Sequence, residues 1–296
     1  MPEGVESYLL ACQLNELAPI NVVIIREIRP KQTSSVSPNS RKTLTKGVPR
    51  EFRLLKVVSI GKMVVFIISI DNDNTCQYGI ITFALSLTGA FRIGNTSKNR
   101  ELEELPPAST RVHFMFGDKN IWFVDPRKLG RITYYETDGL PENSSKIISL
   151  LADHGIRRGL NLGPWSMQGN NIQLLRILNK PKYQNRKTLL VITDQSIMAG
   201  IGNYLRSEIF YVSKIDLNKK LGDLTVQDKR RLTLAIRSIF RKIIRLRGSP
   251  KYTLANGEKG KYVFKCYGVQ GRNKDGVVIK TKKSGNQSFY YPDWKA

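Results

Sequence analysis

The sequence predicts an α+β protein that contains an N-terminal helix, a β-sandwich, a helical unit and a C-terminal β-hairpin. Three observations support this prediction. Runs rich in Val, Ile, Phe and Tyr recur between residues 21 and 135, with turn residues between them. Helical periodicity replaces these runs from about Asp138. Beyond Gly248 the chain is basic and punctuated by glycine.

The chain opens with a short amphipathic helix and continues into strands. Val5, Tyr8, Leu9 and Cys12 follow helical spacing, and Pro19 ends the run. The expected strands cover 21–29, 54–60, 64–70, 78–87, 112–116, 121–125 and 132–135. Short strands separated by turns are typical of a sandwich. The segment 31–49, rich in Ser, Thr and Pro, is expected to be a loop.

Residues 138–144 have the composition of a linker, and helices are expected after it over 144–152, 171–178, 203–211 and 225–247. The last of these begins with a capping pair, Thr225 and Asp228, and has an apolar stripe on an otherwise basic surface. At the C-terminal end, runs 277–280 and 287–291 flank Ser284-Gly285-Asn286, which predicts a hairpin.

Positive charge is the strongest compositional feature. The 296 residues include 48 Lys or Arg and 24 Asp or Glu, which gives a net charge of +24. Residues 205–296 alone carry 22 basic and 7 acidic side chains. Such a field attracts a polyanion, and the release of counterions from phosphates adds affinity. Nucleic acid is therefore the expected partner, and a solubilising surface or a ribosome-type protein is the alternative.

Composition also excludes several classes of protein. No apolar stretch reaches transmembrane length, and the first residues carry acids without a basic leader, so neither a membrane nor a secreted protein is expected. Cys12, Cys76 and Cys266 are far apart and odd in number, which argues against a disulfide framework and excludes a four-cysteine zinc site. We expect an intracellular protein with access to DNA, and the sequence does not determine the compartment.

The N-terminus offers a nucleophile. The chain begins Met1-Pro2-Glu3-Gly4, and removal of Met1 leaves Pro2 as a free secondary amine. An α-amino group has a pKa of about 8, so a useful fraction is uncharged near neutrality and can attack a sugar C1′. Glu3 beside it can transfer protons. The alternative is structural, because proline and acidic residues often begin helices.

Two further patches carry features of a nucleic-acid site. Residues 198–208 place two glycines and Asn203 at the start of a helix, where free backbone amides and the positive helix end suit a phosphate. A nucleotide-binding turn is the competing interpretation, although no strand-turn-helix unit with a downstream acid supports it. Residues 123–130 end a β-run in a turn that exposes Arg127, Lys128 and Leu129. This turn is either an ordinary one or a wedge that enters DNA.

Taken together, the motifs resemble one known family. Eight short motifs occur in order: Pro2-Glu3-Gly4-x-Glu6, Gly61-Lys62, Leu87-Thr88-Gly89, Asp125 to Gly130, Leu162-Gly163-Pro164, Asp194-Gln195, Ala199 to Asn203 with Glu208, and Asn256-Gly257-x-x-Gly260 before Tyr267-Gly268. By these motifs the whole chain resembles the formamidopyrimidine-DNA glycosylase and endonuclease VIII family. The first motif and the Ala-Gly-Ile-Gly-Asn motif are the most specific.

The resemblance implies three parts and one activity. Residues 1–137 would form the N-terminal catalytic helix and the β-sandwich. Residues 138–252 would form a helix-two-turns-helix DNA-binding domain, and residues 253–296 a lesion loop and a β-hairpin finger. The implied protein is a monomeric base-excision repair glycosylase. It would remove oxidised bases from damaged DNA and cleave the abasic site by β/δ-elimination through a Schiff base.

The resemblance also assigns roles to single residues. By position, Pro2 resembles the Schiff-base nucleophile and Glu3 the acid that assists opening of the sugar ring. Lys62 resembles the lysine that binds a phosphate and aids elimination, and Glu6 is a supporting carboxylate. Four more positions match residues that contact DNA. Asn203 matches a phosphate ligand, while Leu87, Arg127 and Leu129 match residues that fill the gap left by a flipped base.

Four departures from the family pattern are visible. Val5 replaces a second proline, which the first helical turn is expected to tolerate, and Ala84 stands where many members have histidine. The finger lacks the zinc cysteines, so the resemblance implies a zincless finger without metal or organic cofactor. Asn286 stands where the family has a finger arginine, and the sequence leaves open whether Asn286 itself or a nearby lysine, Lys282 or Lys283, takes its place, with the lysines slightly favoured.

Two other functions stay open at the level of sequence. Asn286 and Ala84 suggest a catalytically weakened DNA-damage binding protein, which would bind abasic DNA tightly but would form no covalent intermediate. A basic RNA-associated structural protein is supported by charge alone, and the ordered motifs argue against it. The sequence leaves open whether oxidised purines or pyrimidines are preferred, and whether the DNA is single- or double-stranded.

Overall fold

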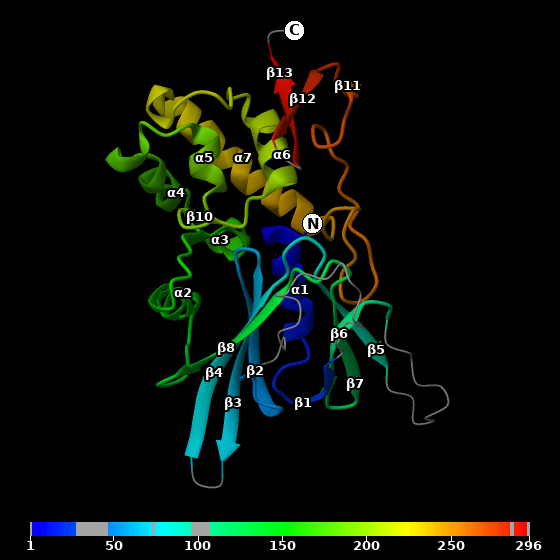
Figure 1. Ribbon diagram of the computed structural model, residues 1–296. Helices are drawn as coiled ribbons and strands as arrows, with labels where there is room; N and C mark the ends of the chain where they lie inside the picture. Colours follow the sequence, from blue (N-terminus) through cyan, green and yellow to red (C-terminus); the bar gives the residue numbers. More distant parts are fainter. Residues whose placement is uncertain (1, 28–46, 73–74, 96–106, 285–286, 295–296) are drawn as a thin grey trace.

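The computed structural model describes residues 2–27, 47–72, 75–95, 107–284 and 287–294 (Figure 1). Helix α1, Gly4–Asn15, lies against the group of β-strands, and the helical unit lies beyond its N-terminal end. A small three-stranded sheet lies at the far end of the helical unit. The predicted α+β fold is confirmed.

The large sheet has eight strands in the order β5-β7-β6-β1-β2-β3-β4-β8, with antiparallel neighbours throughout. The strands are β1 Ile20–Glu27, β2 Glu51–Ile60, β3 Met63–Asn72, β4 Thr75–Ala84, β5 Ala90–Asn95, β6 Thr110–Phe116, β7 Lys119–Val124 and β8 Arg131–Thr137. Strands β4 and β5 lie near opposite ends of this order, yet the ring centroids of Phe83 and Phe91 are 5.0 Å apart. The sheet therefore curls so that its two ends pack face to face, which confirms the predicted sandwich.

The seven expected strands are all present, and the differences are local. The expected run 78–87 is too long, because residues 86–88 form a turn in which Ser86 has a φ of +53°. Strand β5 was not predicted. Its apolar run is short and is interrupted by Arg92, and Gly89 and Gly94 lie at or near its ends. Most of the expected loop 31–49, up to residue 46, lies outside the described residues.

The helical unit contains the four expected helices and two more. The helices are α2 Ser144–Asp153, α3 Leu162–Gln168, α4 Asn171–Leu178, α5 Thr188–Thr193, α6 Asn203–Ser213 and α7 Val226–Arg245. Helices α3 and α5 are too short to show a helical period, and α3 contains Gly163 and Pro164. The predicted capping pair of α7 is confirmed. Thr225 Oγ1 accepts the N–H of Asp228 at 3.1 Å, and Asp228 Oδ2 accepts the N–H of Thr225 at 3.1 Å.

The C-terminal sheet consists of β11 Gly271–Arg272, β12 Val278–Ser284 and β13 Gln287–Asp293. Ser284 pairs with Gln287, so β12 and β13 form the predicted hairpin around residues 285–286, which lie outside the described part of the chain. A small hydrophobic cluster of Tyr211, Cys266 and Ile279 holds the sheet against α6. Burial raises the pKa of the Cys266 thiol, which makes it a packing residue and not a thiolate ligand.

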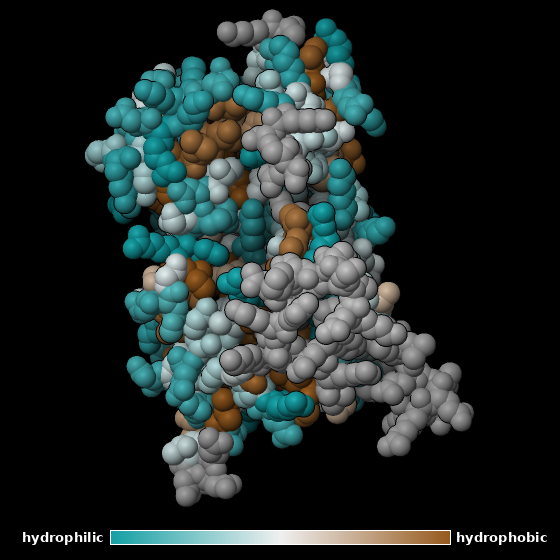
Figure 2. All heavy atoms as spheres, viewed as in Figure 1, coloured by the Kyte–Doolittle hydropathy of each residue, from teal (hydrophilic) through white to brown (hydrophobic). Residues whose placement is uncertain are grey.

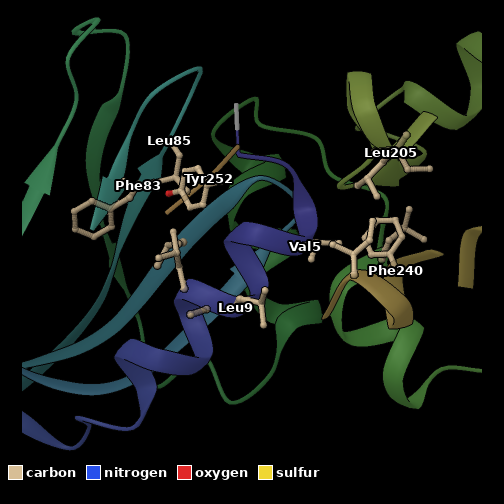
Figure 3. Close-up of a cluster of buried hydrophobic side chains, with 14 of the residues drawn as sticks. Val5, Leu9, Phe83, Leu85, Leu205, Phe240 and Tyr252 are labelled. Atoms are coloured by element: carbon tan, nitrogen blue, oxygen red, sulfur yellow. The ribbon is translucent and has the colours of Figure 1, made fainter. Parts of the chain in front are cut away.

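Helix α1 joins the two halves of the molecule. Val5 is fully buried and faces Leu205 of α6 and Phe240 of α7, while Phe83 and Leu85 of the sandwich lie on another side of the helix (Figure 3). These side chains belong to one continuous hydrophobic cluster. The start of α1 is therefore fixed where the sandwich meets the helical unit.

The boundaries predicted for the three parts stay a prediction. The last strand of the sandwich ends at Thr137 and α2 begins at Ser144. The chain after α7 returns to the sandwich, since the guanidinium of Arg92 donates to the carbonyl oxygens of Thr253 at 3.0 Å and Leu254 at 3.1 Å. The C-terminal part thus has contacts with both halves.

The visible surface of the helical half is mostly hydrophilic, with a smaller hydrophobic patch (Figure 2). Among the described residues, no helix combines the length and the apolar character needed to cross a membrane.

Candidate active site

Glycines allow three backbone segments to meet at the start of α1. The N–H of Gly4 donates to the carbonyl of Gly200 at 2.8 Å, and a Cβ on Gly4 would lie 2.6 Å from the Cα of Gly200. A Cβ on Gly61, in the β2–β3 turn, would lie 2.8 Å from the Cβ of Ala199, and the φ of Gly61 is +60°. Any larger side chain at positions 4 or 61 would separate these segments.

The carboxylate of Glu3 caps helix α6. It accepts the backbone N–H groups of Gly202 at 2.9 Å, Tyr204 at 2.9 Å and Leu205 at 3.1 Å. Gly202 is the N-cap residue of α6 and has no side chain, so Glu3 satisfies these donors from another part of the chain. The expectation that these amides are free for a phosphate is therefore wrong, because a carboxylate of the protein already occupies the helix end.

Lys62 shares this space with Glu3. A Cβ on Gly202 would lie 2.5 Å from Glu3 Cδ and 2.7 Å from Lys62 Nζ. Burial lowers the pKa of Lys62, and the negative charge of Glu3 opposes this shift. The positive charges of Arg206 and Arg158 lower the pKa of Lys62 further. The lysine and the glutamate therefore form a buried pair next to the N-terminus.

Glu3 has a strongly shifted pKa. Its side chain is 1% exposed, and burial raises the pKa from 4.5 to about 7, although Lys62 and the backbone amides act in the opposite direction. A carboxyl group with this pKa is partly protonated at neutral pH. It can therefore donate a proton in a reaction, which an ordinary surface glutamate cannot do.

Pro2 is buried and directly precedes Glu3 in the chain. Its position is fixed by its neighbours, because the N–H of Gly4 is bound to Gly200 and the N–H of Glu3 donates to Glu6 Oε2 at 2.9 Å. The structure thus brings together Pro2, Glu3 and Lys62, as the sequence motifs predicted. Their chemical roles stay predictions.

Glu6 is a buried carboxylate that connects three segments. It accepts the hydroxyl of Tyr204 at 2.8 Å and the N–H of Ser249 at 3.1 Å, in addition to the N–H of Glu3. It thereby joins the start of α1 to α6 and to the chain after α7. This geometry suits a supporting role near Pro2.

A third buried carboxylate, Glu208 of α6, was part of a motif but had no predicted role. It accepts the hydroxyl of Tyr262 at 2.7 Å and the N–H groups of Lys265 at 3.1 Å, Cys266 at 2.9 Å and Tyr267 at 2.9 Å. Glu208 therefore anchors the segment that leads into the C-terminal sheet. The only signal in the sequence was its place in the motif, five residues after Asn203, and the sequence does not reveal that Glu208 is buried.

Asn203 connects α6 to the hairpin. Its Nδ2 donates to the carbonyl of Ser288 in β13 at 3.0 Å, and its Oδ1 accepts Nη2 of Arg206 at 2.6 Å. The guanidinium of Arg206 also lies over the ring of Phe289, 3.7 Å from its centroid. Arg206 was not singled out from the sequence, where it is one of 48 basic residues.

Two loops of the sandwich are held together by the buried carboxylate of Asp125. Its Oδ1 accepts the hydroxyl of Thr88 at 2.6 Å, and its Oδ2 accepts the N–H of Gly130 at 2.6 Å. The three residues expected to fill a gap in DNA all lie on these loops: Leu87 on the first, and Arg127 and Leu129 on the second. Leu87 is half-buried, Arg127 is exposed and Leu129 is 50% exposed.

The other predicted positions are less informative. Asn286 lies outside the described residues. Lys282 is exposed on β12 opposite Phe289, and Lys283 lies opposite Ser288 in the same strand. Ala84 lies opposite Met63 of β3 on one side and opposite Arg131 of β8 on the other. In the described part of the chain no group of three or more His, Cys, Asp or Glu could hold a metal, and the absence of a metal stays a prediction.

Comparison with known proteins finds similar sequences among formamidopyrimidine-DNA glycosylases. No family model matches the chain. The formamidopyrimidine-DNA glycosylase of Rickettsia massiliae is 27% identical over 237 residues, which cover 76% of this chain and 74% of that protein. The enzyme of the same name from Magnetococcus marinus is 26% identical over 224 residues, which cover 73% of this chain and 74% of that protein.

Solved structures show the same fold. The Lactococcus lactis Fpg in complex with DNA containing an abasic site has a TM-score of 0.72 at 18% identity, over 98% of this chain and 97% of that chain. The same protein in complex with DNA containing an oxidised pyrimidine has a TM-score of 0.72 at 19% identity, over 98% of each chain. The chain is similar in sequence to formamidopyrimidine-DNA glycosylases and has the fold of the solved Fpg structures. The resemblance inferred from the ordered motifs is confirmed.

The positions of the predicted residues form a coherent pattern. Pro2, Glu3 and Lys62 lie where the two halves of the molecule meet. Asn203 lies beside them at the start of α6, and the loops of Leu87 and Arg127 belong to the sandwich half. Both halves of the protein therefore contribute residues to one candidate site.

Proposed function

We propose that this protein is a base-excision repair glycosylase that removes oxidised bases from DNA and then cleaves the strand at the abasic site. One observation carries the proposal. Glu3, with a pKa of about 7, is buried against Lys62 directly after Pro2. This arrangement supplies a proton donor and a cation next to a potential amine nucleophile.

The chemistry follows from these three groups. After removal of Met1, the nitrogen of Pro2 attacks C1′ of the damaged nucleotide and the bond from C1′ to the base breaks; the base leaves with the bonding electron pair and takes up the proton that the Pro2 nitrogen releases. Glu3 donates its proton to the ring oxygen as the sugar opens, which leaves an iminium at C1′. Loss of a proton from C2′ then expels the 3′ phosphate. Lys62 stabilises the negative charge of the phosphate during this elimination.

The DNA has to be opened before this reaction can occur. A base must leave the stack to expose its C1′, and the resulting gap costs stacking energy. Leu87, Arg127 and Leu129 lie on neighbouring loops that Asp125 holds together, so they can enter the gap as one unit. Asn203 and the basic surface bind the backbone, which is independent of base identity.

The alternative of a catalytically weakened DNA-damage binding protein is not favoured. Its sequence basis was Asn286 and Ala84, and neither is part of the Pro2, Glu3 and Lys62 group. A protein that only bound damage would need no proton donor next to Pro2, whereas Glu3 is buried there with a pKa of about 7.

A lesion panel tests the proposed function. DNAs that carry one defined oxidised purine or pyrimidine, in single- and double-stranded form, are incubated with the protein, and free base and strand breaks are measured separately. We expect release of at least one oxidised base followed by cleavage, and we expect the Pro2→Gly variant to lose both. The exposed Glu16→Gln variant is the control for a change on the same helix. Tight binding of abasic DNA without release of any base would contradict the proposal.

A further inference from the structure

A basic groove on the outer face of helix α7 lies apart from the candidate active site. The inner face of α7, with the buried Phe240, packs against the start of α1 (Figure 3). On the outer face there are two hollows of about 590 and 470 Å³, and both are lined by Lys242 and Leu246. The hollows therefore form one continuous groove, the α7 groove, along residues 234–246 of the helix and residues 261–275 of the chain that follows it.

The lining of the α7 groove combines apolar and basic side chains. In the described part of the chain its apolar members are Leu234, Leu246, Val263, Phe264 and Val269. Eight further lining residues are Lys or Arg, and four of these are on α7. Asp275 is the one acidic side chain in this described lining, and its Oδ2 is already bonded to Nζ of Lys265 at 2.7 Å. The groove therefore offers apolar surface together with a large excess of positive charge.

The arginines that α7 contributes to the groove have neutral partners within the described ranges. Arg237 and Arg241 donate to the carbonyl oxygen of Ser166 at 3.2 and 2.6 Å, and their other hydrogen-bond acceptors there are an asparagine side chain and a backbone carbonyl. Arg237, Arg241 and Arg245 also follow one another at intervals of four residues, at which like charges on a helix repel. Negative charges in the groove would relieve this repulsion.

Exposed apolar side chains in the groove favour a protein partner over nucleic acid. Leu234 in one hollow is 55% exposed, and Val263 in the other is 70% exposed. Contacts to a nucleic-acid backbone are mostly polar contacts to phosphates, which do not remove apolar surface from water. Both hollows have volumes typical of pockets that bind ligands, so each can accept an apolar side chain of a peptide.

We propose that the α7 groove binds an acidic, amphipathic helical segment of a partner protein. Carboxylates of the segment face the Lys and Arg side chains of the groove, and its apolar side chains enter the two hollows. Leu234 and Leu246 are twelve residues apart, about 18 Å along the helix, which gives room for about three turns of a bound helix. Charge argues against a second copy of this chain as the occupant, because each copy carries +24. The inference does not depend on the proposed function.

Acidic peptides of defined pattern provide the test. The full-length protein is titrated with Glu-rich, helix-forming peptides in which two leucines are seven or eleven residues apart, a span of about 11 or 17 Å. In matched peptides of the same net charge, both leucines are replaced with glutamine. We expect at least one leucine peptide to bind roughly 10-fold or more tightly than its glutamine counterpart, because burial of leucine adds hydrophobic free energy. Binding of both peptides should weaken as salt increases.

Matched pairs of exposed residues locate the bound peptide. Leu234→Gln and Val263→Gln each remove an apolar side chain from one hollow, and both positions are mostly exposed, so the fold should tolerate the changes. Each variant should lose most of the preference for the leucine peptide. Leu190→Gln on α5, 52% exposed, and Val226→Gln at the start of α7, 66% exposed, are the controls. Neither residue lines a hollow of the groove, so both control variants should keep the full preference.

Several results would overturn the proposal. If no leucine peptide binds more tightly than its glutamine counterpart, or if Leu234→Gln and Val263→Gln keep the preference that the control variants show, the groove does not bind such a segment. If both groove variants weaken binding of undamaged duplex DNA as much as binding of the leucine peptide, the groove is a nucleic-acid surface. If the protein alone sediments as a dimer that Val263→Gln dissociates and Val226→Gln does not, the occupant is a second copy of the chain.

Discussion

Glu3 has two roles in this structure that make opposite demands on its carboxyl group. As a cap of α6 it accepts three backbone N–H groups, which favours the ionised form. As a buried group without direct access to water it favours the neutral form, and burial dominates, with a pKa of about 7. Burial therefore leaves Glu3 able to donate a proton near neutral pH, although the contacts that fix its position act against protonation.

Replacing this acid should separate the two activities. We expect Glu3→Gln to reduce release of a damaged base by ~10²- to 10⁴-fold, the usual contribution of general acid catalysis, while cleavage of a ready-made abasic site falls much less. Glutamine keeps the size of the side chain and an oxygen that accepts the amides of α6. Release of free base and strand cleavage are measured on paired substrates. Equal loss of both activities would show that Glu3 has only the capping role.

The pH profile provides a second prediction for the same residue. As pH increases, kcat/KM for base release should rise while the Pro2 amine loses its proton, because a free α-amino group has a pKa of about 8. It should fall while Glu3 loses its proton, with a pKa of about 7. Since the protonated form of Glu3 is the active one, its contribution is present below pH 7 and is lost above it. Glu3→Gln should keep the rising limb and lose the falling limb. A falling limb of unchanged position in Glu3→Gln would rule out Glu3 as its source.

At the scale of elements, the loops joined by Asp125 and the start of α6 contact DNA in different ways. Arg127 and Leu129 extend from a sandwich loop whose position depends on the bonds of Asp125 to Thr88 and Gly130. Asn203 is fixed by the hairpin and Arg206. The first group is suited to filling a gap, and the second is suited to holding the backbone.

This difference predicts different effects of two alanine substitutions. Arg127→Ala should weaken binding of lesion or abasic duplex more than binding of undamaged duplex, because only the former offers a gap. Asn203→Ala should weaken binding of all duplexes by a similar factor. Affinities are measured for matched damaged and undamaged DNAs at one salt concentration. If Arg127→Ala weakens binding of the damaged and the undamaged duplex equally, Arg127 is not a gap-filling residue.

Sequence patterns predicted the elements that carry a long local signal. The 20-residue helix α7, with its capping pair and apolar stripe, and the hairpin around residues 285–286 were both predicted. Helices α3 and α5 were not, because six or seven residues do not complete two helical turns. Strand β5 was hidden by its short apolar run and by glycines at or near its ends.

The site was predictable only where a motif identified it. Pro2, Glu3, Lys62 and Asn203 were found through the family motifs, although they are far apart in the chain. The cap that Glu3 provides for α6 and the stacking of Arg206 on Phe289 were not predicted. Both depend on contacts between residues more than 80 positions apart, which leave no trace in local spacing or composition.

At the scale of the whole molecule, α1 connects the catalytic residues to both halves. Val5 packs against α6 and α7, and the opposite side of α1 packs against the sandwich, so a change in the angle between the halves would move Pro2. The net charge of +24 adds a long-range attraction for DNA to this arrangement. The packing of α1 therefore positions Pro2 for the reaction, and the net positive charge of the protein strengthens its binding to DNA.

The C-terminal sheet should be stable without a metal. Its described core contains Tyr211, Cys266 and Ile279, and the ion pair of Lys280 with Asp293 joins its two longer strands. The chain has three cysteines and two histidines in all, too few and too dispersed for a closed zinc site near the sheet. We expect metal analysis to find no stoichiometric zinc and expect activity to persist in chelator. One zinc per chain, or loss of activity in chelator, would show that the sheet is held differently.

Covalent trapping tests the central claim that Pro2 is the nucleophile. The protein, with loss of Met1 verified by intact mass, is incubated with abasic DNA and borohydride, which reduces an iminium to a stable amine. Peptide mapping then locates the adduct. The account predicts a cross-link on Pro2 and strong loss of trapping in Pro2→Gly, with Glu16→Gln unaffected. An adduct on Lys62 or another lysine, or tight DNA binding without any cross-link, would contradict it.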